Sequence, residues 1–114
     1  MAAANRDAEA LLDIVDAAQQ IQAIVQLQTL EAFKSNREKQ AAFFYFCITI
    51  GEATKRISPA MRTQHPDIPW REMAGLRDIL AHQYDRVDLA TIWNITQTSI
   101  PELLSRLDPL LPSE

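Results

Sequence analysis

The sequence has very little glycine and cysteine, and each shortage excludes a class of protein. Its 114 residues include two glycines and a single cysteine, Cys47. Two glycines leave no glycine-rich phosphate-binding loop and no collagen-like repeat. One cysteine excludes an internal disulfide framework and a cysteine-rich zinc site. We therefore expect a reducing, cytoplasmic environment for this chain.

Long apolar runs are also missing. The longest extends from Ala41 to Ile48, far less than a membrane span needs. The first ten residues lack the basic start and apolar core of a signal peptide. We expect no membrane partner and a single domain over residues 1–114, with residues 1–4 and 109–114 as frayed tails.

Charge is unevenly distributed along the chain. The net charge is −4, so the chain as a whole repels nucleic acid phosphate. By segment, the charge is −3 over residues 1–52, +2 over residues 53–86 and −3 over residues 87–114. Any contact with a polyanion is expected in the middle segment, although chance segregation of surface charge is the simpler explanation of these counts alone.

Hydrophobic periodicity predicts helices along nearly the whole chain. Residues 5–28 carry one apolar stripe at three- and four-residue spacing, with Asn5 placed to cap the start of a helix. Residues 29–34 indicate a short turn. Ser35 and Glu38 then form a capping box, which predicts the start of a second helix.

The second predicted helix, over residues 36–57, is apolar on two faces. One face comprises Phe43, Cys47, Ile50 and Thr54, and the other comprises Ala41, Phe44, Ile48 and Glu52. Both faces need to be covered, but a domain of this size cannot bury many helices completely. One of the two faces is therefore a candidate interface of a two-fold homodimer. The central helix of a monomeric bundle explains the pattern equally well.

Proline and aspartate mark the ends of the remaining helices. A short helix begins at the Ser-Pro pair 58–59 and ends before Pro66, and another is predicted over residues 70–83. Asp88 caps a last helix, in which Pro101 should cause a kink or a break. The predicted fold class is all-α: an antiparallel bundle of four main helices with one short extra helix.

The residues best suited to chemistry lie close together on the helix over residues 70–83 and just after it. Arg77 and Tyr84 share a helix face, Asp78 and His82 can meet, and about 140° of rotation separates Arg77 from His82. Arginine binds phosphate through a planar fork of donors, and histidine moves a proton near neutral pH. Such a set suits metal-free RNA cleavage by the 2′-hydroxyl. A lone histidine at a helix end is, however, more often a cap that suits the helix dipole.

This region resembles the HepT family of helical toxin ribonucleases, within the HEPN superfamily. Arg77, His82 and Tyr84 match the family pattern R-x4-H-x-Y. The flanking segments that are similar are Ile50-Gly51-Glu52-Ala53 with Lys55, Pro69-Trp70-Arg71-Glu72, and Val87-Asp88-Leu89 with Trp93. The chain departs from many relatives at Asp78, where they have Asn, and at Asp85-Arg86, where they have Phe-Gly.

The resemblance implies a function and its partners. The protein would be a HEPN-like homodimer in which two copies each of Arg77 and His82 converge on one RNA phosphate, without a metal or other cofactor. Its second partner would be a minimal nucleotidyltransferase antitoxin that neutralises it by placing AMP on Tyr84. Phosphate added beside Arg77 should repel or block RNA.

Further side chains are expected to support this site or the core. Glu52 continues an apolar helix face and needs a partner. We expect either Arg77, which it would hold in place, or equally Lys55 or Arg56. Asp78 is placed to orient His82. We expect Trp70 and Trp93 to be core or interface anchors and Cys47 to be an inert buried thiol. His65 is expected to be exposed and to have no role.

Two other functions remain open at this stage. The first is a non-catalytic HEPN module that binds nucleotides or a nucleotidyltransferase, which the acidic overall charge and Asp78 favour. The second is a helical dimerisation protein in which the motif is incidental.

Overall fold

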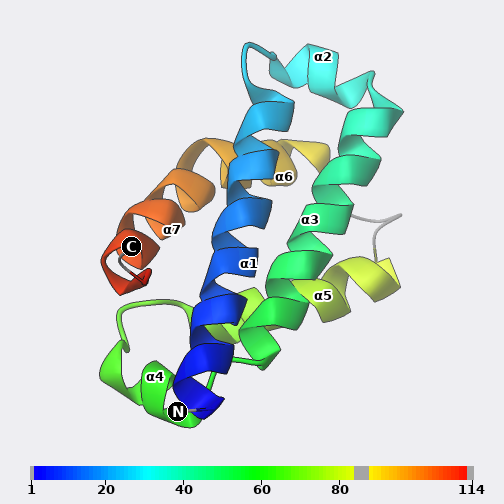
Figure 1. The fold of residues 1–114 in the computed structure, drawn as a ribbon. Coiled ribbons are helices and arrows are strands. Elements are labelled where there is room, and N and C mark those ends of the chain that lie inside the picture. The colour runs from blue at the N-terminus through cyan, green and yellow to red at the C-terminus, as the bar shows by residue number, and fades with distance from the viewer. Residues whose placement is uncertain (1, 84–87, 113–114) are drawn as a thin grey trace.

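The computed structural model describes the backbone of residues 2–83 and 88–112, and the side chains of residues 5–78 and 88–112. These ranges are helical and contain no strand, which confirms the all-α class (Figure 1). The α-helices are α1 (Ala2–Val25), α2 (Leu30–Lys34), α3 (Arg37–Lys55), α4 (Pro59–Gln64), α5 (Trp70–Gln83), α6 (Leu89–Asn94) and α7 (Ile100–Leu107). A π-helical turn, Ile95–Ser99, joins α6 to α7, and a 3₁₀ turn, Asp108–Leu110, follows α7.

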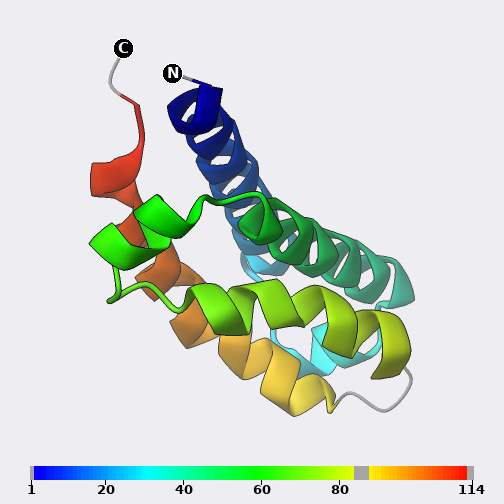
Figure 2. The same cartoon turned by 90° about the horizontal axis from the view of Figure 1, so that it is seen from below.

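Helix α3 lies at the centre of the packing. It runs antiparallel to α1, to which the short helix α2 connects it, and α5 crosses behind it (Figure 1). Figure 2 shows α5 lying against α3, with α6 on the other side of α5, while α7 packs against α1. This arrangement brings the residues that follow Ile50 in α3 next to the second half of α5.

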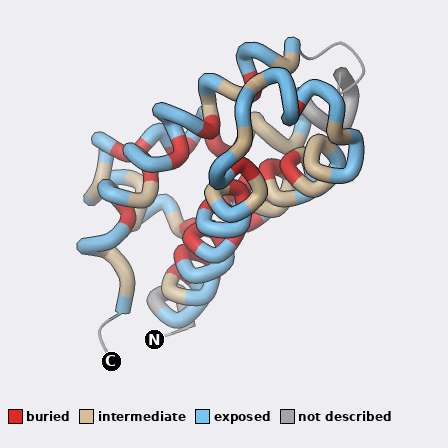
Figure 3. The backbone as a smooth tube through the Cα atoms, turned by 90° about the horizontal axis from the view of Figure 1, so that it is seen from above, coloured by how far each residue is buried: buried red, intermediate tan, exposed pale blue. Residues whose placement is uncertain are grey.

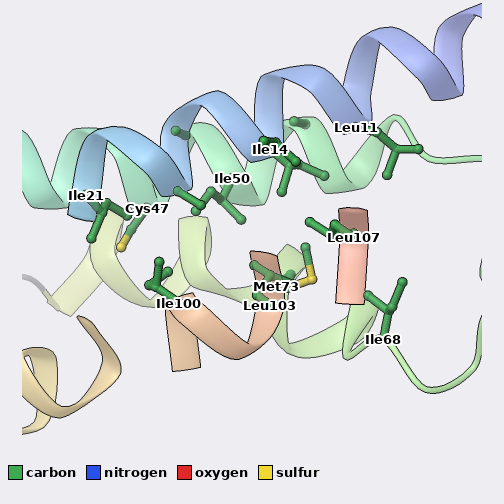
Figure 4. Packing of buried hydrophobic residues seen from close by; sticks show 14 of the residues in the cluster. Leu11, Ile14, Ile21, Cys47, Ile50, Ile68, Met73, Ile100, Leu103 and Leu107 are labelled. Atoms are coloured by element: carbon green, nitrogen blue, oxygen red, sulfur yellow. The ribbon is translucent and has the colours of Figure 1, made fainter. Parts of the chain in front are cut away.

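The core is built from the inward faces of α1, α3, α5 and α7. Figure 3 shows buried positions along these inner faces and exposed positions on the outer ones. The labelled side chains of Figure 4 are among the buried residues of this core: Leu11, Ile14, Ile21, Cys47, Ile50, Ile68, Met73, Ile100, Leu103 and Leu107. Fully burying a side chain of this size contributes about 1.5–3 kcal/mol.

The first helix differs from the prediction at both ends. It begins at Ala2, so Asn5 lies inside the helix and is not its cap. It ends at Val25 and not at residue 28, because Leu27 has a φ of 59° and turns the chain away from the helix.

The predicted turn over residues 29–34 is wrong, because the segment forms α2. Thr29 caps this helix by accepting a hydrogen bond from the Ala32 amide, and Phe33 is completely buried. The predicted capping box of Ser35 and Glu38 is also wrong. Asn36 caps α3 by accepting from the Lys39 amide, while Ser35 ends α2. Asparagine is at least as good an N-cap as serine.

The boundaries set by proline and aspartate are confirmed. Ser58 caps α4, α5 starts at Trp70, and Asp88 caps α6. The helix before Pro101 is interrupted by the π-helical turn, as expected of proline inside a helix. Within the segment predicted to fray from residue 109, Leu110 and Leu111 are partly buried against the core.

No helix within the described ranges is both long enough and apolar enough to cross a bilayer. The bundle topology and the homodimer remain predictions.

Candidate functional site

Helices α3 and α5 are in direct contact where Gly51 faces Arg77. A Cβ atom added to Gly51 would lie 2.7 Å from both the Cβ and the backbone nitrogen of Arg77, and 3.2 Å from its Cα. Only glycine allows two backbones to approach this closely. The crossing therefore fixes the position of Arg77 relative to the last turns of α3.

Four charged side chains surround this crossing and form a cluster: Glu52, Lys55, Arg77 and Asp78. Arg77 Nε lies 2.7 Å from Glu52 Oε1, and Arg77 Nη1 lies 3.3 Å from Asp78 Oδ1. Lys55 Nζ lies 3.4 Å from that same oxygen of Asp78. All four side chains are about half exposed. The charges of this four-charge cluster sum to zero.

The contacts of Arg77 leave part of its guanidinium group available. Its Nε contacts Glu52 and its Nη1 contacts Asp78, while Nη2 has no partner among the residues that the structure describes. Nη2 carries two N–H donors. Arginine uses such donors to bind phosphate oxygens in a planar, bidentate geometry. The site can therefore present a fixed cationic donor to an anion.

The predicted pairing of Glu52 with Arg77 is confirmed. The two cations considered as alternatives pair elsewhere, Lys55 with Asp78 and Arg56 with Asp13 at 2.6 Å. The carboxylate of Glu52 is exposed, so it is not the buried end of an apolar face.

Asp78 contacts cations on both helices. Hydrogen bonds from Arg77 and then from Lys55 hold the pKa of its carboxyl below the usual value, so Asp78 stays ionised at neutral pH. The predicted contact between Asp78 and His82 lies outside the described side chains.

Arg77 and His82 belong to the same uninterrupted helix, α5. The side chain of His82 and the whole of Tyr84 lie outside the described residues. Their placement relative to Arg77 stays a prediction. Among the residues with described side chains, no three His, Cys, Asp or Glu residues are grouped so that they could hold a metal ion.

The expected structural roles are largely confirmed. Trp70 is buried and donates from Nε1 to the carbonyl of His65 at 2.9 Å, and Trp93 packs against Phe33 with ring centroids 5.7 Å apart. His65 is half-buried, and its backbone carbonyl accepts the hydrogen bond from Trp70. The prediction of an exposed, idle residue is therefore wrong. Burial raises the pKa of the Cys47 thiol from 9.0 to about 12, which keeps it protonated and inert.

Sequence reasoning missed two parts of the site. The first is the contact of Gly51 with Arg77, for which a lone glycine inside a helix was the available signal. The second is the contact of Lys55 with Asp78, which joins residues 23 positions apart. Helix periodicity says nothing about which residues meet across two helices.

The fold and this cluster define a small all-helical protein with an exposed, carboxylate-held arginine at a helix crossing. The sequence profile of the family described as "Ribonuclease HepT-like" matches residues 14–110, and the chain belongs to this family of the HEPN superfamily.

Several relatives are similar over most of their length. The chain is 36% identical over 100 residues to "Probable ribonuclease HepT" of Thermococcus cleftensis, which covers 88% of this chain and 91% of that protein. It is 35% identical over 108 residues to each of two Methanocaldococcus jannaschii proteins, "Putative RNase MJ1216" and "Putative RNase MJ0125". These matches cover 94% of this chain and 89% and 93% of the two relatives. No solved structure gives a significant match.

Proposed function

We propose that this protein is a metal-independent endoribonuclease toxin, with Arg77 and His82 as its catalytic residues. Membership of a ribonuclease family supports the activity. The observation that carries the assignment to Arg77 is its half-exposed guanidinium group, which Glu52 holds at the α3–α5 crossing and whose Nη2 is unpaired among the described residues. This is the arrangement that a phosphate-binding arginine needs.

The proposed reaction is an intramolecular transfer. The 2′-oxygen of one nucleotide attacks the adjacent phosphorus, and the bond from phosphorus to the 5′-oxygen breaks. The products carry a 2′,3′-cyclic phosphate and a 5′-hydroxyl. A histidine takes the proton of the 2′-hydroxyl, another acid protonates the 5′-oxygen, and Arg77 stabilises the charge that builds up on phosphate.

A homodimer would supply the second proton-transfer group. The outward face of α3 supports this proposal, because Ile48 is only partly buried and Ala41 and Tyr45 are exposed in the protomer. If two copies pair through this face, their Arg77 side chains lie near the same interface, because Gly51 and Glu52 follow on the same helix. Two copies of His82 would then act as base and acid on one phosphate.

A nucleotidyltransferase antitoxin is the proposed regulator. The phenol oxygen of Tyr84 would attack the α-phosphorus of ATP, and pyrophosphate would leave. The AMP group brings negative charge and bulk to the motif helix, where it opposes RNA binding. Mass spectrometry of the protein co-expressed with a neighbouring nucleotidyltransferase should find AMP on the peptide that contains Tyr84, and an unmodified peptide would contradict this regulation.

The activity itself is tested by RNA cleavage in excess EDTA. We expect the purified protein to cleave RNA under these conditions and to leave 2′,3′-cyclic phosphate ends. The His82→Ala variant should keep the helical circular dichroism spectrum of the parent but lose cleavage. Cleavage that disappears with EDTA, or that survives in His82→Ala, would contradict the proposal.

A non-catalytic nucleotide- or protein-binding module is the second candidate. The observation that favours it is the balance of charge at the site, where Glu52 and Asp78 offset Lys55 and Arg77. Such a neutral cluster attracts a polyanion less than a cationic site does. Calorimetry with nucleotides, run beside the cleavage assay, separates the two candidates, because binding without cleavage supports the module.

A further inference from the structure

Two cations from different helices meet at one carboxylate oxygen. Asp78 Oδ1 lies 3.4 Å from Lys55 Nζ and 3.3 Å from Arg77 Nη1. A lysine and an arginine that converge on a single anionic oxygen form the type of contact that binds a phosphate oxygen. The oxygen of Asp78 therefore lies where an oxygen of a bound phosphate would contact both cations.

The contacts of Asp78 are the loosest in the four-charge cluster. Its two distances, 3.3 and 3.4 Å, compare with 2.7 Å between Arg77 Nε and Glu52. The Asp78 side chain is 55% exposed. Exposed ion pairs of this kind contribute little to stability, so the carboxylate can leave without unfolding the site. The shorter contact of Glu52 would still hold the guanidinium group.

We propose that Lys55 and Arg77 together bind a phosphate of RNA, and that the carboxylate of Asp78 occupies this position in the free protein and leaves when RNA binds. The inference rests on the proposed function, because RNA is the ligand. Lys55 becomes a further substrate-binding residue. Asp78 becomes an internal competitor of the substrate.

The displacement changes the charge that the substrate meets. With Asp78 in place, the four-charge cluster is neutral, and Lys55 Nζ and Arg77 Nη1 both contact its carboxylate. When Asp78 rotates away, Lys55 and the Nη1 and Nη2 groups of Arg77 are all free to contact phosphate. RNA binding then competes with the internal carboxylate, so removing the charge of Asp78 should strengthen binding.

A purely supporting role for Asp78 makes the opposite prediction. If Asp78 only oriented Arg77, its replacement by Asn would lower kcat and leave RNA binding unchanged or weaker. If Asp78 competes with phosphate, the Asp78→Asn variant binds RNA more tightly. The direction of the change in affinity therefore distinguishes the two roles.

Two test variants have close controls in the same chain. Lys55→Met is matched by Lys34→Met, since Lys34 is similarly exposed and is also paired with an acid, Glu31. The whole length of α3, roughly 28 Å, separates the two lysines. Asp78→Asn is matched by Asp13→Asn, because Asp13 has a nearly equal exposure and pairs with Arg56.

The experiment measures binding of a fully 2′-O-methylated single-stranded oligoribonucleotide, which cannot be cleaved because it lacks the attacking hydroxyl. We expect Lys55→Met to raise the Kd by about threefold to tenfold and to reduce the slope of log K against log salt by ~0.7. Asp78→Asn should lower the Kd by a similar factor. Both control variants should stay within about twofold of the parent.

The inference is overturned if Asp78→Asn binds no more tightly than Asp13→Asn, or if Lys55→Met binds as tightly as Lys34→Met. Cleavage of unmodified RNA by the parent protein is measured in parallel. Cleavage by the parent together with variants that bind like their controls would contradict only this inference. Binding that changes as expected, without any cleavage, would contradict the nuclease and keep the phosphate site. Circular dichroism confirms that each variant is folded.

Discussion

Gly51 and Arg77 touch backbone to backbone. A Cβ atom on Gly51 would lie only 2.7 Å from both the Cβ and the amide nitrogen of Arg77, which is closer than real Cβ contacts. A glycine inside a helix costs about 1 kcal/mol relative to alanine. At position 51 this loss of helix stability allows α3 and α5 to cross closely. The candidate catalytic arginine is therefore placed by the packing of the two helices and not by a loop.

Replacing Gly51 should disturb both the fold and the site. The added methyl group of Gly51→Ala has to push α5 away, and we expect a loss of about 1–3 kcal/mol in the free energy of unfolding. RNA cleavage should fall as well, because Arg77 moves with α5. Urea denaturation and a cleavage assay measure the two effects.

Gly75 is the matched control for this substitution. Among the described residues, no atom beyond its chain neighbours and its own helix backbone lies within 4 Å of a Cβ added to this other helical glycine. Gly75→Ala should therefore stabilise the protein by about 0.5–1 kcal/mol through helix propensity. Equal stability changes in the two alanine variants would show that the crossing does not depend on Gly51.

Removing the carboxylate that holds Arg77 should lower the rate more than the affinity. In Glu52→Ala, Arg77 loses the 2.7 Å contact at Nε, and the cluster gains positive charge. We expect kcat to fall roughly tenfold, while stability changes by less than about 1 kcal/mol because the pair is exposed. RNA binding should not weaken.

The control for Glu52 is another carboxylate paired with an arginine. Glu102→Ala breaks the 2.6 Å contact with Arg106 on α7. Its kcat should equal that of the parent. A kcat for Glu52→Ala that matches the Glu102→Ala value would mean that the contact does not position the arginine.

The buried thiol should make stability fall at high pH. The pKa of Cys47 is raised from 9.0 to about 12 in the folded protein, so the unfolded chain loses this proton first. Below pH 9 the thiol is protonated in both states and does not affect the free energy of unfolding. Between pH 9 and pH 12 the free energy of unfolding falls, because only the unfolded chain loses the proton. At pH 10.5 we expect a loss of about 2 kcal/mol relative to pH 8, seen by urea denaturation.

A Cys47→Ala variant is the control for this pH dependence. It lacks the titrating thiol, so its stability should change less between pH 8 and pH 10.5 than that of the parent. The same loss in both proteins would assign the pH dependence to other groups. The thiol of the parent should also resist alkylation until the protein unfolds.

Local signals explain which parts of the fold could be predicted. Proline and capping residues act within a few positions, so the starts of α4, α5 and α6 were predictable. Helix α2 was not predictable in this way, because the conformation of this segment depends on the burial of Phe33 by distant parts of the chain. Tertiary packing overrides turn propensity at such positions.

In the candidate site, too, local sequence patterns predicted some features, while others depend on how the helices pack. Periodicity placed Glu52 on an apolar face of its helix and left three cations as possible partners. The choice of Arg77 depends on the angle at which α5 crosses α3 and on the absence of a side chain at Gly51. The link from Lys55 to Asp78 depends on the same crossing, and no spacing within one helix could indicate it.

The single-turnover rate of RNA cleavage by Arg77→Lys tests the central claim most directly. Lysine keeps the charge but loses the planar fork that contacts Glu52 and that we propose to bind phosphate. The control is Arg71→Lys, the same substitution at an exposed position of the same helix. We expect the rate of Arg77→Lys to fall at least ~100-fold while Arg71→Lys cleaves like the parent. If Arg77→Lys cleaves RNA as fast as Arg71→Lys, Arg77 is not the group that stabilises the reacting phosphate.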